Sequence, residues 1–163
     1  MPLPRGAAPS ARVRIGLVSD THGVLRPEVL DFLAGCDQLI HAGDICERAI
    51  LDALASIAPL TAVRGNNDHG LWATELSESA ILRAGGIGIC VIHDLSRLDA
   101  ATLHESVRVV VSGHSHRPHA AERSGRLFVN PGSAGPRRFR LPIAAAELLI
   151  EGDAVTARIR EFG

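Results

Sequence analysis

The sequence predicts an α/β fold made by a single domain over residues 12–163. Residues 13–65 alternate strand-like and helix-like segments, whereas residues 80–159 are mostly strand-like. Alternation of strands and helices is typical of a parallel sheet covered by helices, and short connections between strands favour antiparallel or mixed pairing. The chain has 163 residues, of which 46% are hydrophobic, so it can bury a core without disulfides or a structural metal.

The first half is expected to contain three strands and two helices. The expected strands are VRIGLVSD (13–20), DQLIHAGD (37–44) and LTAVRG (60–65). Apolar residues recur at helical spacing in RPEVLDFLAG (26–35) and in CERAILDALASI (46–57). This order predicts a parallel β-α-β-α-β unit, in which functional groups gather at the carboxyl ends of the strands.

The second half is expected to be rich in strands, with one helix at SRLDAATLHE (96–105). The expected strands are AILRAGG (80–86), IGICVIHD (87–94), VRVVVSGH (107–114), RLFVNPGS (126–133), AAELLI (145–150) and AVTARI (154–159). No repeat or internal domain boundary is evident.

Composition excludes several classes of function. Seventeen basic residues, all arginine, oppose eighteen acidic ones, so the net charge of −1 gives no footprint for nucleic-acid or membrane binding. Three cysteines without C-x-x-C spacing predict neither a disulfide framework nor a zinc ribbon. Residues 1–11 lack an apolar stretch of signal-peptide length and are expected to form a disordered tail. We expect a cytoplasmic protein and leave homo-oligomerisation open.

Side chains that can bind metals follow five successive strand-like segments. Each motif alone is weak evidence, but their ordered recurrence favours a metal site over coincidence. Residues i and i+2 of extended backbone face the same way, so D-x-H and H-x-H can each direct two ligands into one space. Oxygen and imidazole donors suit Mn, Fe, Zn or Ni. Two ions fit if one carboxylate bridges them, and the candidate ligands are Asp20, His22, Asp44, Asn66, His93, His114 and His116.

The motifs SDTHG, GD, GNND, a strand-ending histidine, GHSH and NPGS occur in that order between about Val13 and Ile159. This series resembles the calcineurin-like metallophosphoesterases, specifically their small bacterial and archaeal phosphodiesterase branch. The resemblance implies a four-layer α-β-β-α sandwich of two mixed sheets flanked by helices, with a two-metal site at the strand ends.

The resemblance also implies roles for individual residues. One metal ion would bind Asp20, His22 and His116; the other would bind Asn66, His93 and His114; and Asp44 would bridge them. The catalytic residues would be Asp20, Asp44, Asn66 and His114. The implied cofactors are two divalent ions, Mn first, with Fe, Zn or Ni as alternatives. The implied activity is hydrolysis of small phosphodiesters by a hydroxide that the two metals activate.

Two residues depart from the family pattern. Asn67 stands where many relatives carry the histidine proposed to protonate the leaving group, and an amide cannot act as an acid. We expect Asn67→His to restore a proton donor paired with Asp68. His69 could donate the proton instead, as could His119, although surface histidines are the simpler interpretation. Asp94 stands where a glycine is common.

The charge of the expected site favours a phosphodiester over a dianionic monoester. We expect Asn67, Arg137 and Arg138 to bind substrate, while a solvated basic patch remains open for the two arginines. The alternatives are a non-catalytic scaffold on the same fold, and a nuclease or protein phosphatase of the same superfamily. Similarly, His41 either orients a ligand or packs in its strand.

Overall fold

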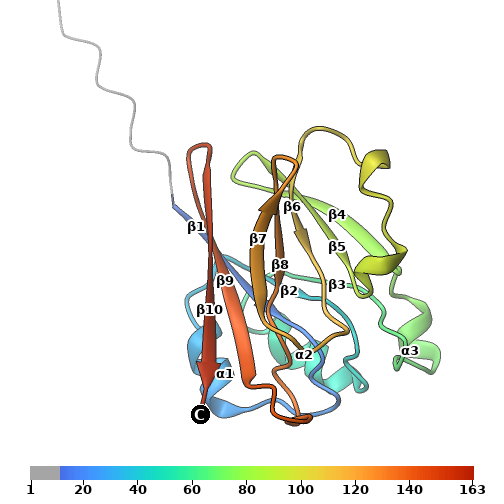
Figure 1. Cartoon of the computed structure of the whole chain (residues 1–163). Helices are drawn as coiled ribbons and strands as arrows, with labels where there is room; N and C mark the ends of the chain where they lie inside the picture. Colours follow the sequence, from blue (N-terminus) through green and yellow to red (C-terminus); the bar gives the residue numbers. More distant parts are fainter. Residues whose placement is uncertain (1–11) are drawn as a thin grey trace, which may run out of the picture.

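The computed structural model describes residues 12–163, and the tail expected at residues 1–11 lies outside them. Two sheets account for the strands of this part of the chain (Figure 1). The first has the order β10-β9-β1-β2-β3, in which β1, β2 and β3 are parallel and β9 and β10 are antiparallel. Its strands are β1 (Val13–Val18), β2 (Gln38–His41), β3 (Leu60–Ala62), β9 (Ile143–Glu151) and β10 (Ala154–Phe162).

The second sheet is mixed and has the order β4-β5-β6-β8-β7. The pairs β5–β6 and β6–β8 are parallel, whereas β4–β5 and β7–β8 are antiparallel hairpins. Its strands are β4 (Ser79–Ala84), β5 (Ile87–Ile92), β6 (Val107–Val111), β7 (His119–Arg123) and β8 (Arg126–Asn130). The predicted parallel first half and mixed second half are therefore confirmed, and the predicted two-sheet sandwich with them.

Three apolar layers hold the molecule together. The largest lies between the sheets and contains Ile15, Leu17, Ile89 and Leu148, all fully buried. A second layer packs the outer face of the first sheet against α1 (Pro27–Leu33) and α2 (Arg48–Ala55). In Figure 1 these helices lie on the side away from the second sheet. Because apolar packing holds both faces of the first sheet and the inner face of the second, the strands form a well-packed base for the loops at their ends.

The outer face of the second sheet has a thinner cover than the sequence predicted. The helix expected at residues 96–105 is replaced by two 3-10 turns, Leu95–Arg97 and Ala100–Thr102. Asp94 and Asp99 accept hydrogen bonds from backbone N–H groups two residues ahead, which competes with α-helix formation. A single helical turn, α3 (Leu71–Thr74), precedes β4. Among residues 12–163 no helix is long and apolar enough to span a membrane.

Candidate metal centre

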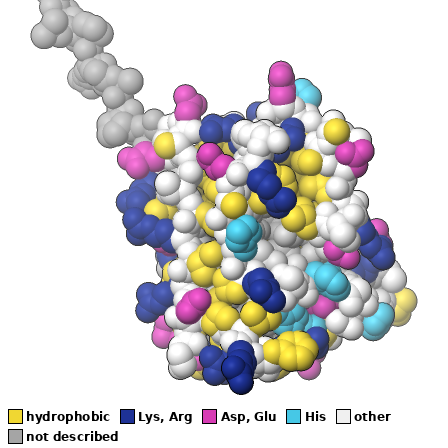
Figure 2. Space-filling model, in the orientation of Figure 1, with side chains coloured by type: hydrophobic (Ala, Val, Ile, Leu, Met, Phe, Trp, Pro, Cys, Tyr) yellow, Lys and Arg dark blue, Asp and Glu magenta, His cyan; other side chains and the backbone are white. Residues whose placement is uncertain are grey.

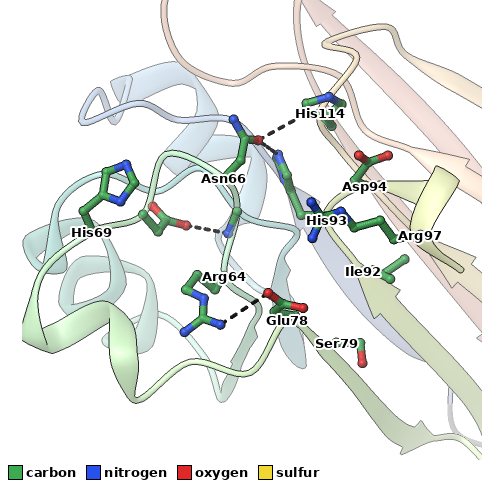
Figure 3. A pocket seen from close by; sticks show the side chains of 12 residues that line it. Arg64, Asn66, His69, Glu78, Ser79, Ile92, His93, Asp94, Arg97 and His114 are labelled. Carbon is green, nitrogen blue, oxygen red and sulfur yellow. Dashed lines mark hydrogen bonds and ion pairs between the residues drawn. The ribbon is translucent and has the colours of Figure 1, made fainter.

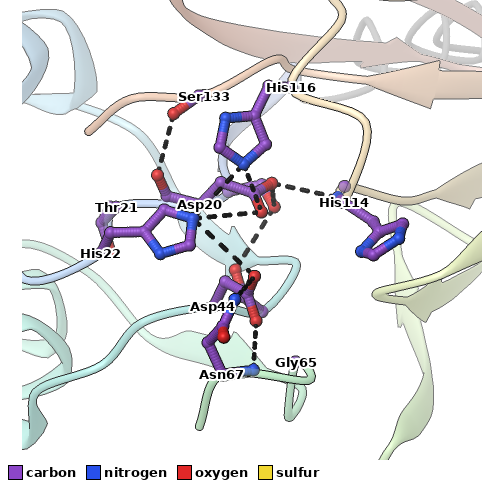
Figure 4. A network of polar contacts seen from close by, with 12 residues as sticks. Asp20, Thr21, His22, Asp44, Gly65, Asn67, His114, His116 and Ser133 are labelled. Atoms are coloured by element: carbon purple, nitrogen blue, oxygen red, sulfur yellow. Dashed lines mark hydrogen bonds and ion pairs between the residues drawn. The ribbon is translucent and has the colours of Figure 1, made fainter. Parts of the chain in front are cut away.

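The candidate ligands converge at one edge of the sandwich, where strands of both sheets end. Figure 4 shows Asp20, His22, Asp44, His114 and His116, and Figure 3 shows Asn66 and His93 beside His114. Parallel pairing aligns Val18 of β1 with His41 of β2 and with Ala62 of β3, so the loops that follow start at one level. The second sheet contributes His93 directly after β5 and the loop 112–118 after β6. The predicted gathering of functional groups at strand ends is confirmed.

The local backbone differs from the extended geometry that the sequence predicted. Four candidate ligands have a left-handed backbone conformation and not an extended one. Their φ angles are +53° (Asp20), +45° (His22), +70° (His114) and +61° (His116). Asp20 and His22 still point into one space. His114 and His116, in contrast, approach different partners: Nδ1 of His114 lies 3.1 Å from Oδ1 of Asn66, and Nε2 of His116 lies 3.3 Å from Oδ1 of Asp20. The assumption that i and i+2 face the same way was therefore wrong for this pair.

The first group of donors is formed by Asp20, His22 and His116. The Nε2 atoms of the two histidines lie 3.3 Å apart, and Oδ1 of Asp20 lies 3.3 Å from Nε2 of His116. Oδ1 of Asp20 also lies 3.8 Å from Nε2 of His22. All three side chains are largely buried, which suits the capture of one cation.

The second group forms around His93. Its Nε2 atom lies 3.4 Å from Oδ2 of Asp44 and 3.0 Å from Oδ1 of Asn66. The same amide oxygen lies 3.1 Å from Nδ1 of His114, which is exposed. Each of the seven residues predicted as ligands therefore contributes an atom to one continuous cluster.

Asp44 lies between the two groups. Its Oδ2 atom is 3.7 Å from Nε2 of His22 and 3.4 Å from Nε2 of His93. Asp20 is the second link, since its Oδ1 atom is 4.0 Å from Nε2 of His93. The arrangement gives Asp44 the position that a bridging carboxylate needs.

The donor cluster fits divalent cations. Oδ1 of Asp20 is buried and accepts no hydrogen bond from any described residue, which is costly for a carboxylate without a cation nearby. The Nδ1–H group of His93 donates to the carbonyl oxygen of Ala42 across 2.7 Å, so the Nε2 lone pair faces the acceptors Asp44 and Asn66. Cations would satisfy this acceptor-rich space, and a backbone carbonyl behind a ligating imidazole is the usual support.

The electrostatics of the cluster keep its acceptors charged. Burial alone would raise the pKa of Asp44, but the nearby His93 and two hydrogen bonds from Asn67 hold that pKa well below its usual range. Burial lowers the pKa of His22, against the attraction of Asp44 and Asp20. Burial raises the pKa of the Cys46 thiol to about 11. Its Sγ atom lies 3.6 Å from Nδ1 of His22, whereas the donor group uses the other ring nitrogen, Nε2. The donors are therefore oxygen and imidazole nitrogen, as the sequence predicted.

Asp68 ties the supporting loops together. Its buried carboxylate accepts hydrogen bonds from the backbone N–H groups of Asp44, Ile45, Cys46 and Gly65 at 2.8–3.0 Å. Two bonds reach each oxygen, which fills the acceptor capacity of the group. These four bonds leave Asp68 no free acceptor site for the histidine that was expected to pair with it at position 67. A carboxylate in a glycine-bounded turn was the signal in the sequence for this role.

Asn67 is directed at Asp44. Its backbone N–H donates to Oδ1 of Asp44 at 2.8 Å, and its side-chain amide donates to Oδ2 at 2.9 Å. The two adjacent asparagines thus point differently, since Asn66 presents its oxygen to His93 and His114.

Buried polar groups behind the cluster hold its loops. His41 is fully buried; its Nδ1 accepts from the N–H of Gly43, so its Nε2–H donates to the hydroxyl of Thr21. Burial lowers the pKa of His41 to about 4, which keeps it neutral. His41 is therefore a packed strand histidine that also supports the Asp44 loop. Similarly, Asn130 donates to the carbonyl oxygen of Gly113 and holds the loop that carries His114.

Glycines permit the close approach of these loops. A Cβ atom on Gly65 would overlap the Asp44 carboxylate, and one on Gly135, in the NPGS loop, would overlap the carbonyl oxygen of Thr21. The adjacent Ser133 donates from its hydroxyl to the carbonyl oxygen of Asp20 at 2.9 Å.

Cavities open beside the donor cluster, on a face where Figure 2 shows histidines around a hollow. The cavity in Figure 3 has a volume of about 630 Å³, is lined by Asn66, His93 and His114, and also contains Arg64 and Arg97, which the sequence did not single out. His69 and His119 are exposed, and each lines a cavity that reaches His114.

The loop 136–140 carries the two arginines expected to bind substrate. Arg137 and Arg138 are both exposed. Burial is the main cause of the lowered pKa of His22, and the positive charge of Arg138 lowers it further. Arg138 therefore lies near the first donor group. Phe139, between Arg138 and Arg140, is 94% exposed.

Fold and site together define a two-sheet α/β sandwich that carries a cluster of candidate metal ligands at its strand ends. Residues 13–153 match the family model described as the calcineurin-like phosphoesterase superfamily domain. The chain therefore belongs to the calcineurin-like phosphoesterase superfamily, a family of metal-dependent hydrolases. The resemblance found in the sequence motifs is confirmed.

Individual relatives support the assignment. The chain is 33% identical over 158 residues to a probable metallophosphoesterase of Methanocaldococcus jannaschii, covering 89% of this chain and 79% of the relative. Its fold is similar to that of a predicted phosphoesterase of Streptococcus pneumoniae (TM-score 0.74, 26% identity, 93% and 90% of the chains covered). It is also similar to Vps29 of Chaetomium thermophilum (TM-score 0.78, 25% identity, 91% and 88% covered).

Proposed function

We propose that the protein is a metal-dependent phosphodiesterase that hydrolyses small phosphodiesters at a centre of two divalent ions. The observation that carries the proposal is the position of Asp44, whose Oδ2 atom lies within 3.7 Å of Nε2 atoms from both donor groups. A single ion would leave one of these groups without a partner. Mn is the expected metal, with Fe, Zn or Ni as alternatives, because the donors are carboxylate, amide and imidazole.

The residues have distinct proposed roles. Asp20, His22 and His116 would hold one ion, Asn66, His93 and His114 the other, and Asp44 would bridge them. Ions held by these residues would lower the pKa of a bound water and would neutralise charge that develops on phosphoryl oxygens. The carbonyl of Ala42 fixes the tautomer of His93, so that its Nε2 lone pair stays directed at the centre. Asp20, Asp44, Asn66 and His114 are the proposed catalytic residues.

Substrate binding is proposed for side chains on either side of the centre. Arg137 and Arg138 are exposed donors on the loop 136–140 and can meet a phosphoryl oxygen of the substrate. Asn67 would influence the substrate through Asp44, to which its amide donates. A diester carries one negative charge and a monoester carries two. The arginines near the centre are exposed, so solvent screens their charge and they neutralise a dianion poorly. The site therefore favours the diester.

Metal stoichiometry tests the two-ion centre without reference to activity. Protein loaded with Mn²⁺ and freed of excess metal should retain close to two ions per chain. Asp44→Ala should reduce the count to one or fewer, whereas His104→Ala, which changes an exposed histidine outside the cluster, should keep two. One tightly held ion in the unaltered protein would contradict the proposal.

Hydrolysis of bis(p-nitrophenyl) phosphate tests the reaction. Turnover should require added divalent metal, stop on chelation and disappear in a folded His93→Ala variant, while His104→Ala remains active. Turnover that survives chelation and His93→Ala would place the chemistry outside the cluster.

A non-catalytic interaction protein is the second candidate, because the fold is similar to that of Vps29. Protein that retains both ions but hydrolyses no phosphodiester or phosphomonoester would favour this candidate. The complete set of candidate ligands favours the enzyme. The cytoplasmic location and the oligomeric state stay predictions from the sequence.

A further inference from the structure

Two cavities meet at the candidate metal centre and are separated by the side chains of Asp94 and His114, which line both. We call the first the polar cavity; it has a volume of about 630 Å³ and includes Arg64, Glu78 and Arg97. We call the second the apolar cavity; it has a volume of about 400 Å³ and includes Leu95, Phe128 and Val129. A group bound beside His114 therefore has a separate cavity on each side.

The polar cavity is lined by both hydrogen-bond donors, such as Arg64 and Arg97, and acceptors, such as Glu78 and Asp94. The guanidinium group of Arg64 lies 3.5 Å from Oε1 of Glu78, so the arginine charge already has a partner. Asp94 and Arg97 lie on another wall of the cavity (Figure 3). A second anionic group would meet two carboxylates here, whereas hydroxyl and amide groups could bond to both kinds of partner. The cavity suits a neutral polar group.

The apolar cavity continues away from the centre. Leu95, Arg123 and Phe128 also line a further cavity of about 300 Å³, which reaches Leu98 under the 3-10 turns. The guanidinium group of Arg123 lies over the Phe128 ring, 4.8 Å from its centroid. The cavity therefore has one planar cationic group beside its apolar side chains. An aromatic or aliphatic group would bury apolar surface in this space, which favours its binding.

From this arrangement we infer that the substrate is an asymmetric phosphodiester, with a polar arm in the polar cavity and an apolar or aromatic arm in the apolar cavity. The inference rests on the proposed function. A phosphodiester has two substituents on phosphorus, and the cavities diverge from His114, which is proposed to contact the reacting group. A monoester has a single arm and would leave one cavity empty. Asp94 and His114 would then separate the two arms.

The test uses two diesters that share the p-nitrophenolate leaving group. Thymidine 5′-(p-nitrophenyl) phosphate has a polar second arm, and methyl p-nitrophenyl phosphate has almost none. Arg97→Ala should raise KM for the thymidine diester about 10-fold more than for the methyl diester, as loss of a charge-assisted hydrogen bond does. The matched control is Arg83→Ala, because Arg83 is an exposed arginine on β4 that lines none of these cavities. This variant should leave KM unchanged for both diesters.

The apolar cavity is tested in the same assay. Leu95→Ser should raise KM for both diesters about 10-fold, because both carry the aryl arm. Leu103→Ser is the control, since Leu103 packs in the same apolar layer as Leu95 but lines none of these cavities. Equal effects of Leu95→Ser and Leu103→Ser, or equal effects of Arg97→Ala on both diesters, would overturn the inference. If neither diester is hydrolysed, the proposed function fails. The Kd of each diester, measured by equilibrium dialysis for the same variants and controls, then shows whether the two cavities bind the two arms.

Discussion

The side-chain amide of Asn67 donates a hydrogen bond to Oδ2 of Asp44 at 2.9 Å, and the backbone N–H of the same residue donates to Oδ1 at 2.8 Å. Both oxygens of the candidate bridging carboxylate are thus oriented by one neighbour. Asn67→Ala removes one of these bonds and keeps the other. We expect it to weaken Mn²⁺ binding about 10-fold, the lower end of the effect seen when a ligand loses its support. Calorimetric titration measures this, and His69→Ala, which alters an exposed neighbour, should bind as tightly as the unaltered protein.

Asn67→His should leave the dependence of rate on the leaving group unchanged. A catalytic imidazole needs a partner that orients it, and both oxygens of Asp68 are already engaged by backbone N–H groups. The measurement is kcat/KM across aryl and alkyl phosphodiesters of increasing leaving-group pKa. A clearly shallower slope for the variant would mean that the imidazole finds another partner.

Asp68→Asn should destabilise the protein although it barely changes side-chain volume. The amide nitrogen would face backbone N–H donors that now bond to a carboxylate oxygen, and leaving such buried donors unpaired costs about 3 kcal/mol. Urea unfolding measures the loss. Asp52→Asn is the control, because the Asp52 side chain is 72% exposed and pairs only loosely with Arg48, so its effect should stay below about 0.5 kcal/mol. Equal stability of the two variants would refute the structural role of Asp68.

Gly135→Ala should disturb the candidate metal centre from a distance. The added Cβ would overlap the Thr21 carbonyl and lie 2.7 Å from that of Asp20, and both are backbone atoms that cannot turn aside. We expect a loss of about 1–3 kcal/mol in stability and weaker metal binding. The comparison is Gly125→Ala, where the backbone is left-handed (φ +78°), unlike at Gly135, and nothing lies within 4 Å of the Cβ. That variant should lose stability alone, and equal metal affinity in both would contradict the prediction.

Divalent metal should stabilise the folded protein. Ions that bind the native cluster and not the unfolded chain add about 2.7 kcal/mol when the free metal is 100 times Kd. The Tm should therefore rise by about 5–10 °C with Mn²⁺, since a chain of this size gains about 2–4 °C per kcal/mol. Thermal unfolding with and without chelator measures the shift. Asp20→Asn should abolish it and His104→Ala should keep it; an unchanged Tm in the unaltered protein would argue against tight binding.

The sequence predicted those parts of the fold that carry a strong hydrophobic pattern. The central strands β1, β5 and β6 are apolar runs, and each lies where it was expected. Strand β7 was missed because its sequence, HAAER, has no alternation and is mostly exposed; only its hairpin with β8 makes it a strand. Such tertiary pairing leaves no local signal.

The candidate site was predictable in membership but not in geometry. Residue types and order identified the seven candidate ligands, because chemistry restricts which side chains bind metals. The divergence of His114 and His116 depends on left-handed backbone angles that loop packing imposes. The roles of Asp68 and Arg97 depend on contacts between loops distant in sequence, which a linear pattern does not encode.

The position of β1 between β2 and β9 has a consequence for protein synthesis. On the ribosome, β1 to β3 emerge early, but the other edge of β1 is paired only by residues 143–151. Until then the nascent chain exposes an unpaired strand edge and the inward face of its first sheet, both of which promote aggregation. Completion of the first sheet must therefore follow translation of residues 143–162. A ribosome stalled before residue 143 would hold a product that depends on chaperones.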